Sequence, residues 1–244
     1  MNIEQANSSS VAELWSDSEV QVMSARSLEE AAQAMAAAIY HRFKESVVLA
    51  RAFVTVPNAE LPKRNQEFVR TLVDSAKITA ELEPQTPVLS LIGTYGQEEP
   101  WCYRRQSKDH VGIPLLSSAF VGAIPMISRL LKELGVPVDW VDSHDSEMIV
   151  NAIGNSTGLF FVQDAATATD SQGRKIIAAQ DFVSQYGVRS VFGVGGAYST
   201  GQIAVIIIFC RTHITRYLAQ QFLALSTFFI SKTRRHIERG RVFL

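Results

Sequence analysis

The most restrictive feature of the sequence is a pair of apolar segments in the last quarter of the chain. Residues 188–196 (VRSVFGVGG) and 202–211 (QIAVIIIFCR) are rich in β-branched and aromatic residues, and the five residues 197–201 (AYSTG) separate them. Two such segments joined by a short stretch of turn-forming residues predict a β-hairpin. Any fold of this chain must therefore include antiparallel strand pairing.

The other segments alternate between helical and extended patterns. Further strands are predicted over 46–56, 86–96, 111–116 and 158–165, and helices over 28–43, 64–77, 117–135, 174–187 and 214–240. Ser27 is expected to cap the first of these helices, and Pro114 predicts that its strand lies at a sheet edge or a bulge. Strands that cluster and end in a hairpin favour an α+β fold: a central, mainly antiparallel sheet flanked by helices, with long helices near both ends of the chain.

The chain has no internal repeat and no linker-like change of composition, so its 244 residues are expected to form one domain. Residues 1–25 begin with a polar, serine-rich stretch and predict a flexible extension with one short helix. The domain is placed at 26–235, and a basic tail follows at 236–244.

The composition excludes several classes of protein. The formal net charge is −1, which gives no long-range attraction to nucleic acid or anionic lipid, so neither is expected as a partner. No apolar run reaches the length of a membrane span, and the N-terminal residues do not resemble a signal peptide. The two cysteines, Cys102 and Cys210, form neither a disulfide framework nor a zinc pattern. We therefore expect a cytoplasmic protein.

The order of elements and some local sequence resemble the GAF domain, the small-molecule sensor fold related to PAS domains. GAF domains typically end with Gly-Val-Arg-Ser, an apolar strand, a hairpin containing glycine, a second strand and a helix, and residues 187–190 (GVRS) stand in the matching place. Residues 160–164 (FFVQD) are similar to the preceding strand and 28–39 (LEEAAQAMAAAI) to the leading helix. The resemblance covers 26–235 in element order, although 56–157 are longer than in a minimal GAF domain. It implies a sensor and leaves the ligand open.

A candidate ligand site lies in residues 101–115 (WCYRRQSKDHVGIPL), where cations outnumber the carboxylate of Asp109 in an otherwise neutral chain. Arginine pairs bidentately with carboxylate or phosphate, and an indole can cover an apolar part of a ligand. In a GAF-like fold such a loop lies over the ligand pocket. The alternative is a solvated loop whose arginines pair with surface carboxylates. The predicted ligand-binding residues are Trp101, Cys102, Arg104, Arg105, His110, Asp164 and Arg189.

Cys102 supports a second hypothesis, a thiol-dependent redox enzyme. Neighbouring cations favour the thiolate of a cysteine, and the free methionine sulfoxide reductases are GAF-like proteins that use cysteines. Those enzymes use a cluster of cysteines on neighbouring loops, whereas Cys210 falls at the end of an apolar strand and is expected to be buried. We therefore predict no catalytic residue.

Three of these residues could contact a metal or an organic ligand: His110, Asp164 and Arg189. His110 has no second histidine at metal-ligand spacing, so neither a metal nor haem is expected. Asp164 follows a predicted strand, with a turn as the default role, and is a plausible partner for the guanidinium of Arg189. Both are placed in a second layer around a small organic ligand that the sequence does not identify.

The last helix predicts association of two copies of the chain. Its apolar face is wider than the cover of one sheet requires, and basic residues follow it. The apolar residues are Ile214, Leu218, Phe222, Leu225, Phe228 and Phe229. Sensors of this type commonly dimerise through terminal helices. The sequence thus predicts a small-molecule-binding sensory domain of a signalling or transcriptional-control system, in which ordering of 95–117 is transmitted through the terminal helices of a homodimer to a downstream protein. A purely structural or interaction module is the remaining alternative.

Overall fold

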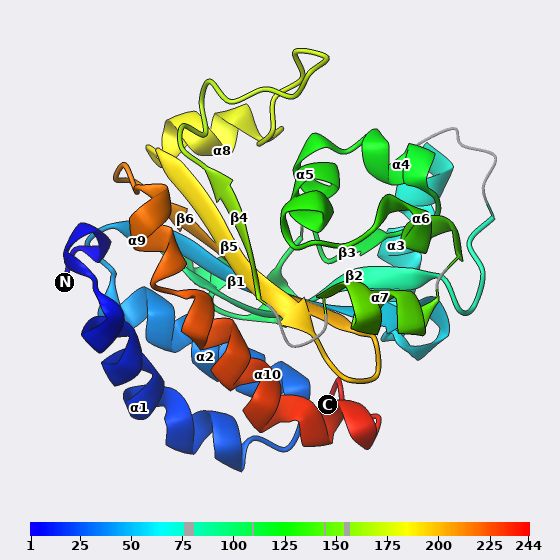
Figure 1. Ribbon diagram of the computed structural model, residues 1–244, viewed down its shortest axis with the longest axis horizontal. Helices are drawn as coiled ribbons and strands as arrows, with labels where there is room; N and C mark the ends of the chain where they lie inside the picture. Colours follow the sequence, from blue (N-terminus) through cyan, green and yellow to red (C-terminus); the bar gives the residue numbers. More distant parts are fainter. Residues whose placement is uncertain (76–80, 109, 144, 154–156) are drawn as a thin grey trace.

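The computed structural model of the chain describes residues 1–75, 81–108, 110–143, 145–153 and 157–244, which build a six-stranded sheet in the order β3-β2-β1-β6-β5-β4 (Figure 1). The strands are β1 Val47–Pro57, β2 Pro87–Gly96, β3 Gly112–Pro114, β4 Gly158–Val162, β5 Ser190–Ala197 and β6 Ile203–Cys210. Each pair of neighbours is antiparallel, and β5 and β6 form the predicted hairpin. The predicted α+β fold is confirmed, and Pro114 lies in an edge strand.

The two central strands are buried on both faces of the sheet. All residues of β6 and all of β1 except Pro57 are buried. Ile206 and Ile208 enter a core on one face, whereas Val205 and Ile207 enter a second core on the other. Strands that are apolar on both faces need cover on both faces.

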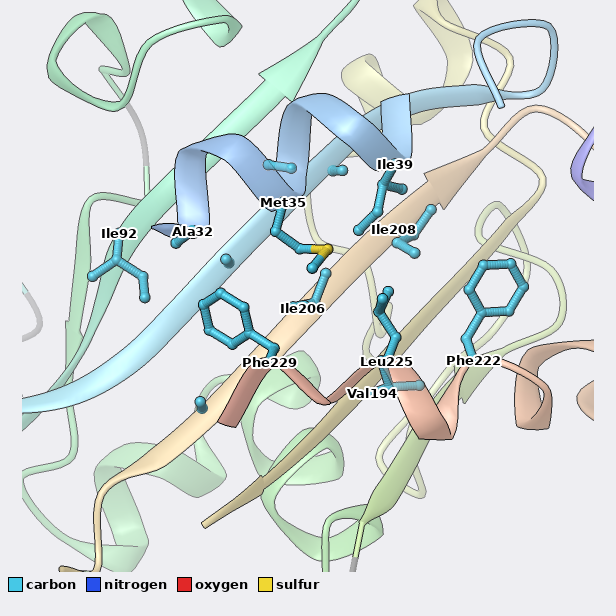
Figure 2. Close-up of a cluster of buried hydrophobic side chains, with 14 of the residues drawn as sticks. Ala32, Met35, Ile39, Ile92, Val194, Ile206, Ile208, Phe222, Leu225 and Phe229 are labelled. Carbon is cyan, nitrogen blue, oxygen red and sulfur yellow. The ribbon is translucent and has the colours of Figure 1, made fainter. Parts of the chain in front are cut away.

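Three helices form the layer over the first face: α1 Ser8–Ser24, α2 Leu28–Arg42 and α10 Leu223–Glu238 (Figure 1). Ser27 accepts a hydrogen bond from the Glu30 backbone N–H, so it caps α2 as predicted. Figure 2 shows α2 and α10 meeting over β6. The side chains labelled there are Ala32, Met35, Ile39, Ile92, Val194, Ile206, Ile208, Phe222, Leu225 and Phe229.

Short helices cover the second face and the sheet margins. They are α4 Ser118–Gly122, α5 Pro125–Glu133, α6 Val138–Ser143, α7 Ser146–Ile153 and α8 Gln180–Gln185. α3 Lys63–Ser75 packs beside β3, and α9 Arg216–Gln220 precedes α10. The 3₁₀ turns are η1 Ile3–Gln5, η2 Asn58–Glu60, η3 Glu99–Trp101 and η4 Arg104–Gln106.

The N-terminal extension differs from the expectation of a flexible start with one short helix. α1 has 17 residues, and its N-cap Asn7 accepts a hydrogen bond from the Ser10 backbone N–H. Val11, Leu14 and Val22 are buried in the first core. The helix propensities of this serine-rich start are too low to predict α1. Only the N-cap and the spacing of the apolar residues indicate the helix.

Three predicted helices are shorter or divided. The helix expected over 117–135 is two helices, because Pro125 begins a new one at its first position. The helix expected over 174–187 begins only at Gln180, since Asp170 holds Arg174 in a turn through its backbone N–H and its guanidinium. The helix expected over 214–240 divides before Leu223. Two residues of the helix expected over 64–77 lie outside the described ranges, and α6 and α7 were not predicted.

Side chains from helices satisfy the backbone at both margins of the sheet. Gln33 of α2 donates to the Thr94 carbonyl at 2.7 Å and accepts from the Thr94 N–H at 3.3 Å, where β2 extends beyond the short β3. At the opposite edge, Arg129 donates to the Phe161 carbonyl and Glu133 accepts from the Phe161 N–H, each at 2.7 Å. These contacts occupy groups that another strand could otherwise bind.

The wide apolar face of the last helix is largely used within the chain. Phe222, Leu225 and Phe229 are buried in the first core, and Phe228 stacks on Trp15 of α1 with ring centroids 5.3 Å apart. The basic residues also contact α1. Lys232 pairs with Glu19 at 3.4 Å, and the Arg235 guanidinium donates to backbone carbonyls at the end of α1.

At Gly93, α2 approaches β2 at backbone distance, which gives a first prediction. A Cβ at Gly93 would lie 2.4 Å from the backbone carbon of Ala32. Replacing Gly93→Ala forces the helix away from the strand, so we expect the free energy of unfolding to fall by about 2 kcal/mol or more in urea denaturation. Gly122→Ala is the control, since no atom lies within 4 Å of its Cβ position. An unchanged stability of the Gly93 variant would contradict this packing.

His236 of α10 predicts a dependence of stability on pH. Burial lowers the pKa of this imidazole, and the cations of Arg235, Arg241 and Arg239 add to the effect against a weaker opposite effect of Glu30. Because the folded pKa lies below the unfolded value of about 6.5, the unfolded chain binds more protons as the pH falls through that value. The contribution of the neutral imidazole to the free energy of unfolding is therefore fully present above pH ~6.5 and decreases as the pH falls below that value.

The measurement is the urea midpoint of the wild type and of His236→Gln between pH 8 and pH 5.5. We expect the wild-type midpoint to fall more steeply toward acid, because the amide does not titrate in this range. Equal slopes for the two proteins would show that His236 does not titrate differently in the folded state.

Candidate functional site

The loop between β2 and β3, residues 97–111, contains most of the predicted site residues and contacts both layers of the molecule. Its first part packs on the second core. Trp101, at the end of η3, lies edge to face against Tyr186 and Phe182, with ring centroids 4.7 and 5.6 Å away. Phe182 in turn contacts Phe209 of β6. The indole thus anchors this end of the loop to α8 and to the sheet.

Cys102 is held by backbone groups. Its Sγ lies 3.5 Å from the carbonyl oxygens of Gly96 and Glu98, and its own carbonyl accepts from the Gln33 side chain at 2.9 Å. The Tyr95 phenol is a neighbour whose pKa is raised, first by burial and then by Cys102. The second cysteine of the chain, Cys210, is fully buried in β6, and burial raises the pKa of its thiol. The pair of accessible loop cysteines that the redox hypothesis requires is therefore not formed.

Arg104 and Arg105 point toward the helices that cover the first face of the sheet, where both form ion pairs with Glu29 of α2. Arg104 is buried, and its Nη2 lies 3.0 Å from Glu29 Oε2. Arg105 is largely exposed, and its Nε lies 3.3 Å from Glu29 Oε1. Burial lowers the pKa of Arg104, while Glu29 opposes that shift. Arg104 is thus an internal member of a charged cluster and not a solvated side chain.

Two further arginines hold the same loop. Arg51, in the central strand β1, is 8% exposed, and its Nη2 donates to the Ser107 hydroxyl at 3.2 Å. Arg64, near the start of α3, donates to the carbonyl oxygens of Arg105 and Ser107. Neither was predicted as a site residue. The signal for Arg51 was its place as the one charged residue in an otherwise uncharged strand, residues 47–56.

His110 is exposed and adopts a backbone φ of +56°, the left-handed region that few non-glycine residues occupy. Asp109, part of the same predicted segment, lies outside the described residues. Across the described ranges, no three His, Cys, Asp or Glu side chains gather in the way that metal ligands do.

Asp164 and Arg189 lie at the ends of β4 and β5, but the expected ion pair between their side chains does not form. Asp164 instead accepts hydrogen bonds from the backbone N–H groups of Ala166 and Thr167. Burial alone would raise the pKa of Asp164, but these hydrogen bonds together lower it. Arg189 is exposed and acts through its backbone, which bonds to Ala165 and Cys210 at 2.7 Å each. A turn explains this position, because the two strand ends are held by main-chain groups.

A separate groove of about 380 Å³ lies between α1 and α2, away from the loop residues described above. Small side chains of α2 line it, together with Asp17 and Arg42, which pair at 3.3 Å. None of the predicted site residues lines it.

Comparisons with known proteins concern the fold. No family model and no curated protein sequence matches the chain. It is similar to the GAF domain from Acinetobacter phosphoenolpyruvate-protein phosphotransferase, with 11% identity, a TM-score of 0.46, and 95% of this chain and 98% of that one covered. It is also similar to the GAF domain from the Coxiella burnetii phosphoenolpyruvate-protein phosphotransferase, with 10% identity, a TM-score of 0.49, and 96% of this chain and 99% of that one covered.

The phycoerythrobilin-bound GAF domain from a cyanobacterial phytochrome is similar at 9% identity and a TM-score of 0.49, with 94% of this chain and 97% of that one covered. This likeness is to GAF domains, the family that the sequence itself resembles. At these identities and TM-scores it does not extend to ligand or activity. Among the described helices, none has the length and apolar character needed to cross a bilayer.

The two cysteines predict a simple pattern of thiol reactivity. Cys102 is half-buried and Cys210 is fully buried. With an aromatic disulfide reagent at neutral pH, we expect the native protein to expose one thiol, reacting more slowly than free cysteine, and the unfolded protein to expose both. The native signal should disappear in Cys102→Ser. Reaction of native Cys102 faster than free cysteine would instead favour the thiol-dependent enzyme.

Proposed function

We propose that the chain is a small-molecule-binding sensory domain and that its ligand is anionic. The single observation that supports this is Arg51, a guanidinium buried in a central strand beneath a loop rich in cations. The planar guanidinium of an arginine pairs bidentately with carboxylate and phosphate groups. The place of Arg51 beneath this loop, in contact with Ser107, suits a site for such a group.

The loop that contacts Arg51 carries further groups that such a site can use. Arg64 binds its backbone at Arg105 and Ser107, and Trp101 supplies an aromatic surface at its start. Arg104 and Arg105 of the same loop pair with Glu29. Functional residues concentrate on loops held by rigid scaffolds. Trp101, Cys102, His110 and the strand-end residues Asp164 and Arg189 stay within the proposal as residues around the ligand.

The proposal includes the sensory context that the resemblance to GAF domains implies. The domain, residues 26–235, would act in the cytoplasm as part of a signalling or transcriptional-control system and pass its state to a downstream protein. A homodimer through the terminal helices is supported by Phe228 and Val20, which remain 38% and 73% exposed on α10 and α1. Nucleic acid is not proposed as a partner, because Lys232 and Arg235 are engaged with α1.

The test is a thermal-shift comparison of the wild type, Arg51→Met and Arg70→Met against a panel of small carboxylates and phosphates. Arg70 is exposed on α3 and serves as the control. A ligand at about 100 times its Kd stabilises by about 2.7 kcal/mol, or roughly 5–10 °C for a chain of this size. We expect that shift in the wild type and in Arg70→Met, and its loss in Arg51→Met.

Native mass spectra of the same samples test the rest of the proposal. We expect twice the 27.0 kDa mass of the chain, with the added mass of any small molecule that purifies with it. A monomer would contradict the homodimer. A flat response of the wild type to the whole panel, without a bound molecule in the spectrum, would contradict the anion site and favour an interaction module.

A further inference from the structure

The C-terminal segment after α10 lies on the start of α2. Helix α10 ends at Glu238, and Gly240 follows with a φ of +61°. The N–H groups of Gly240 and Arg241 bond back to the carbonyls of Ile237 and His236. The chain then turns toward α2. The first two backbone N–H groups of α2, those of Leu28 and Glu29, donate to the carbonyls of Arg241 and Val242 at 2.9 Å each. These N–H groups have no partner within their own helix.

Glu29 joins this segment to the loop between β2 and β3. Its side chain is 10% exposed. Oε2 accepts from Arg104 at 3.0 Å and from the Leu244 N–H at 3.2 Å, and Oε1 accepts from Arg105 at 3.3 Å. One carboxylate therefore binds two segments of chain that are about 140 positions apart in sequence.

The two segments also contact each other directly. The Arg104 guanidinium lies over the Phe243 ring, with its Cζ 5.1 Å from the ring centroid. Arg105 Nη2 donates to the Leu244 carbonyl at 3.2 Å. Val242 is buried in the first core. The contacts form a closed cycle of α2, the loop and the C-terminal segment.

The energetic character of Arg104 makes this cycle cooperative. Arg104 is 6% exposed, and its Nε has no hydrogen-bond partner in the described part of the chain. If Glu29 moves away, a buried cation loses its counter-charge, and if Arg104 moves away, a buried carboxylate loses one of its two cations. Neither segment can therefore leave without weakening the site of the other.

We propose that Glu29 couples the conformation of the 97–111 loop to that of the C-terminal segment, so that the two segments are released together. A change in the loop would free residues 241–244 and the end of α10, and a protein that captured the C-terminal segment would loosen the loop. The biological use of this device rests on the proposed function, since the loop carries the proposed ligand site. The coupling itself is a property of the chain without ligand.

The experiment is hydrogen–deuterium exchange of the full chain, comparing the wild type with Glu29→Gln. We expect exchange to rise about tenfold or more in peptides covering both 98–107 and 238–244, with no change in β5 and β6. Glu30→Gln is the matched control, because Glu30 is the next residue of the same helical turn and its carboxylate bonds to the exposed Arg26. It should leave both segments as in the wild type.

The reciprocal variant is Phe243→Ala, which leaves every charge in place. We expect it to raise exchange in 98–107 as well as in its own segment, and it keeps the test valid if Glu29→Gln does not fold. A rise confined to one of the two segments in either folded variant would overturn the coupling. A negative ligand screen would count against the sensory proposal alone, since these measurements need no ligand.

Discussion

The structure depends on a sheet whose central strands are apolar on both faces. β1 and β6 cannot present either face to water, so two separate cores must form, and the chain supplies a different cover for each. Long helices close the first face, with Gly93 allowing α2 to approach β2 at backbone distance. Short helices and the loop over Arg51 close the second. Long helices therefore pack on one side of the sheet, and short helices and a loop pack on the other.

The same constraint explains how the margins of the sheet are completed. Helices that cover the faces also reach the edges, where Gln33 bonds to both backbone groups of Thr94, and Arg129 with Glu133 does the same at Phe161. Gln33 additionally binds the Cys102 carbonyl. The edge of β2 and the loop that follows it are therefore positioned by one amide, which links the proposed site to α2 independently of Glu29.

The sequence predicted what depends on local pattern. The hairpin, the strands and the helix capped by Ser27 follow from periodicity and turn chemistry, which act over a few residues. It could not place Arg104 against Glu29, because that contact joins positions 75 apart and depends on how the loop passes the short β3. The expected pair of Asp164 and Arg189 failed for a related reason. Backbone N–H groups two and three residues away satisfy Asp164 before a distant guanidinium can.

The charged residues around this loop form two groups, one on each face of the sheet. Arg51 and Ser107 lie on the second face, whereas Arg104 and Arg105 pair with Glu29 on the first. A ligand that binds Arg51 can therefore do so without breaking the ion pairs of Arg104 and Arg105 with Glu29. The two groups meet where Arg64 binds the carbonyl oxygens of both Arg105 and Ser107. Arg64 thus joins the part of the loop that contacts Arg51 to the part that pairs with Glu29, because it bonds to the backbone of both.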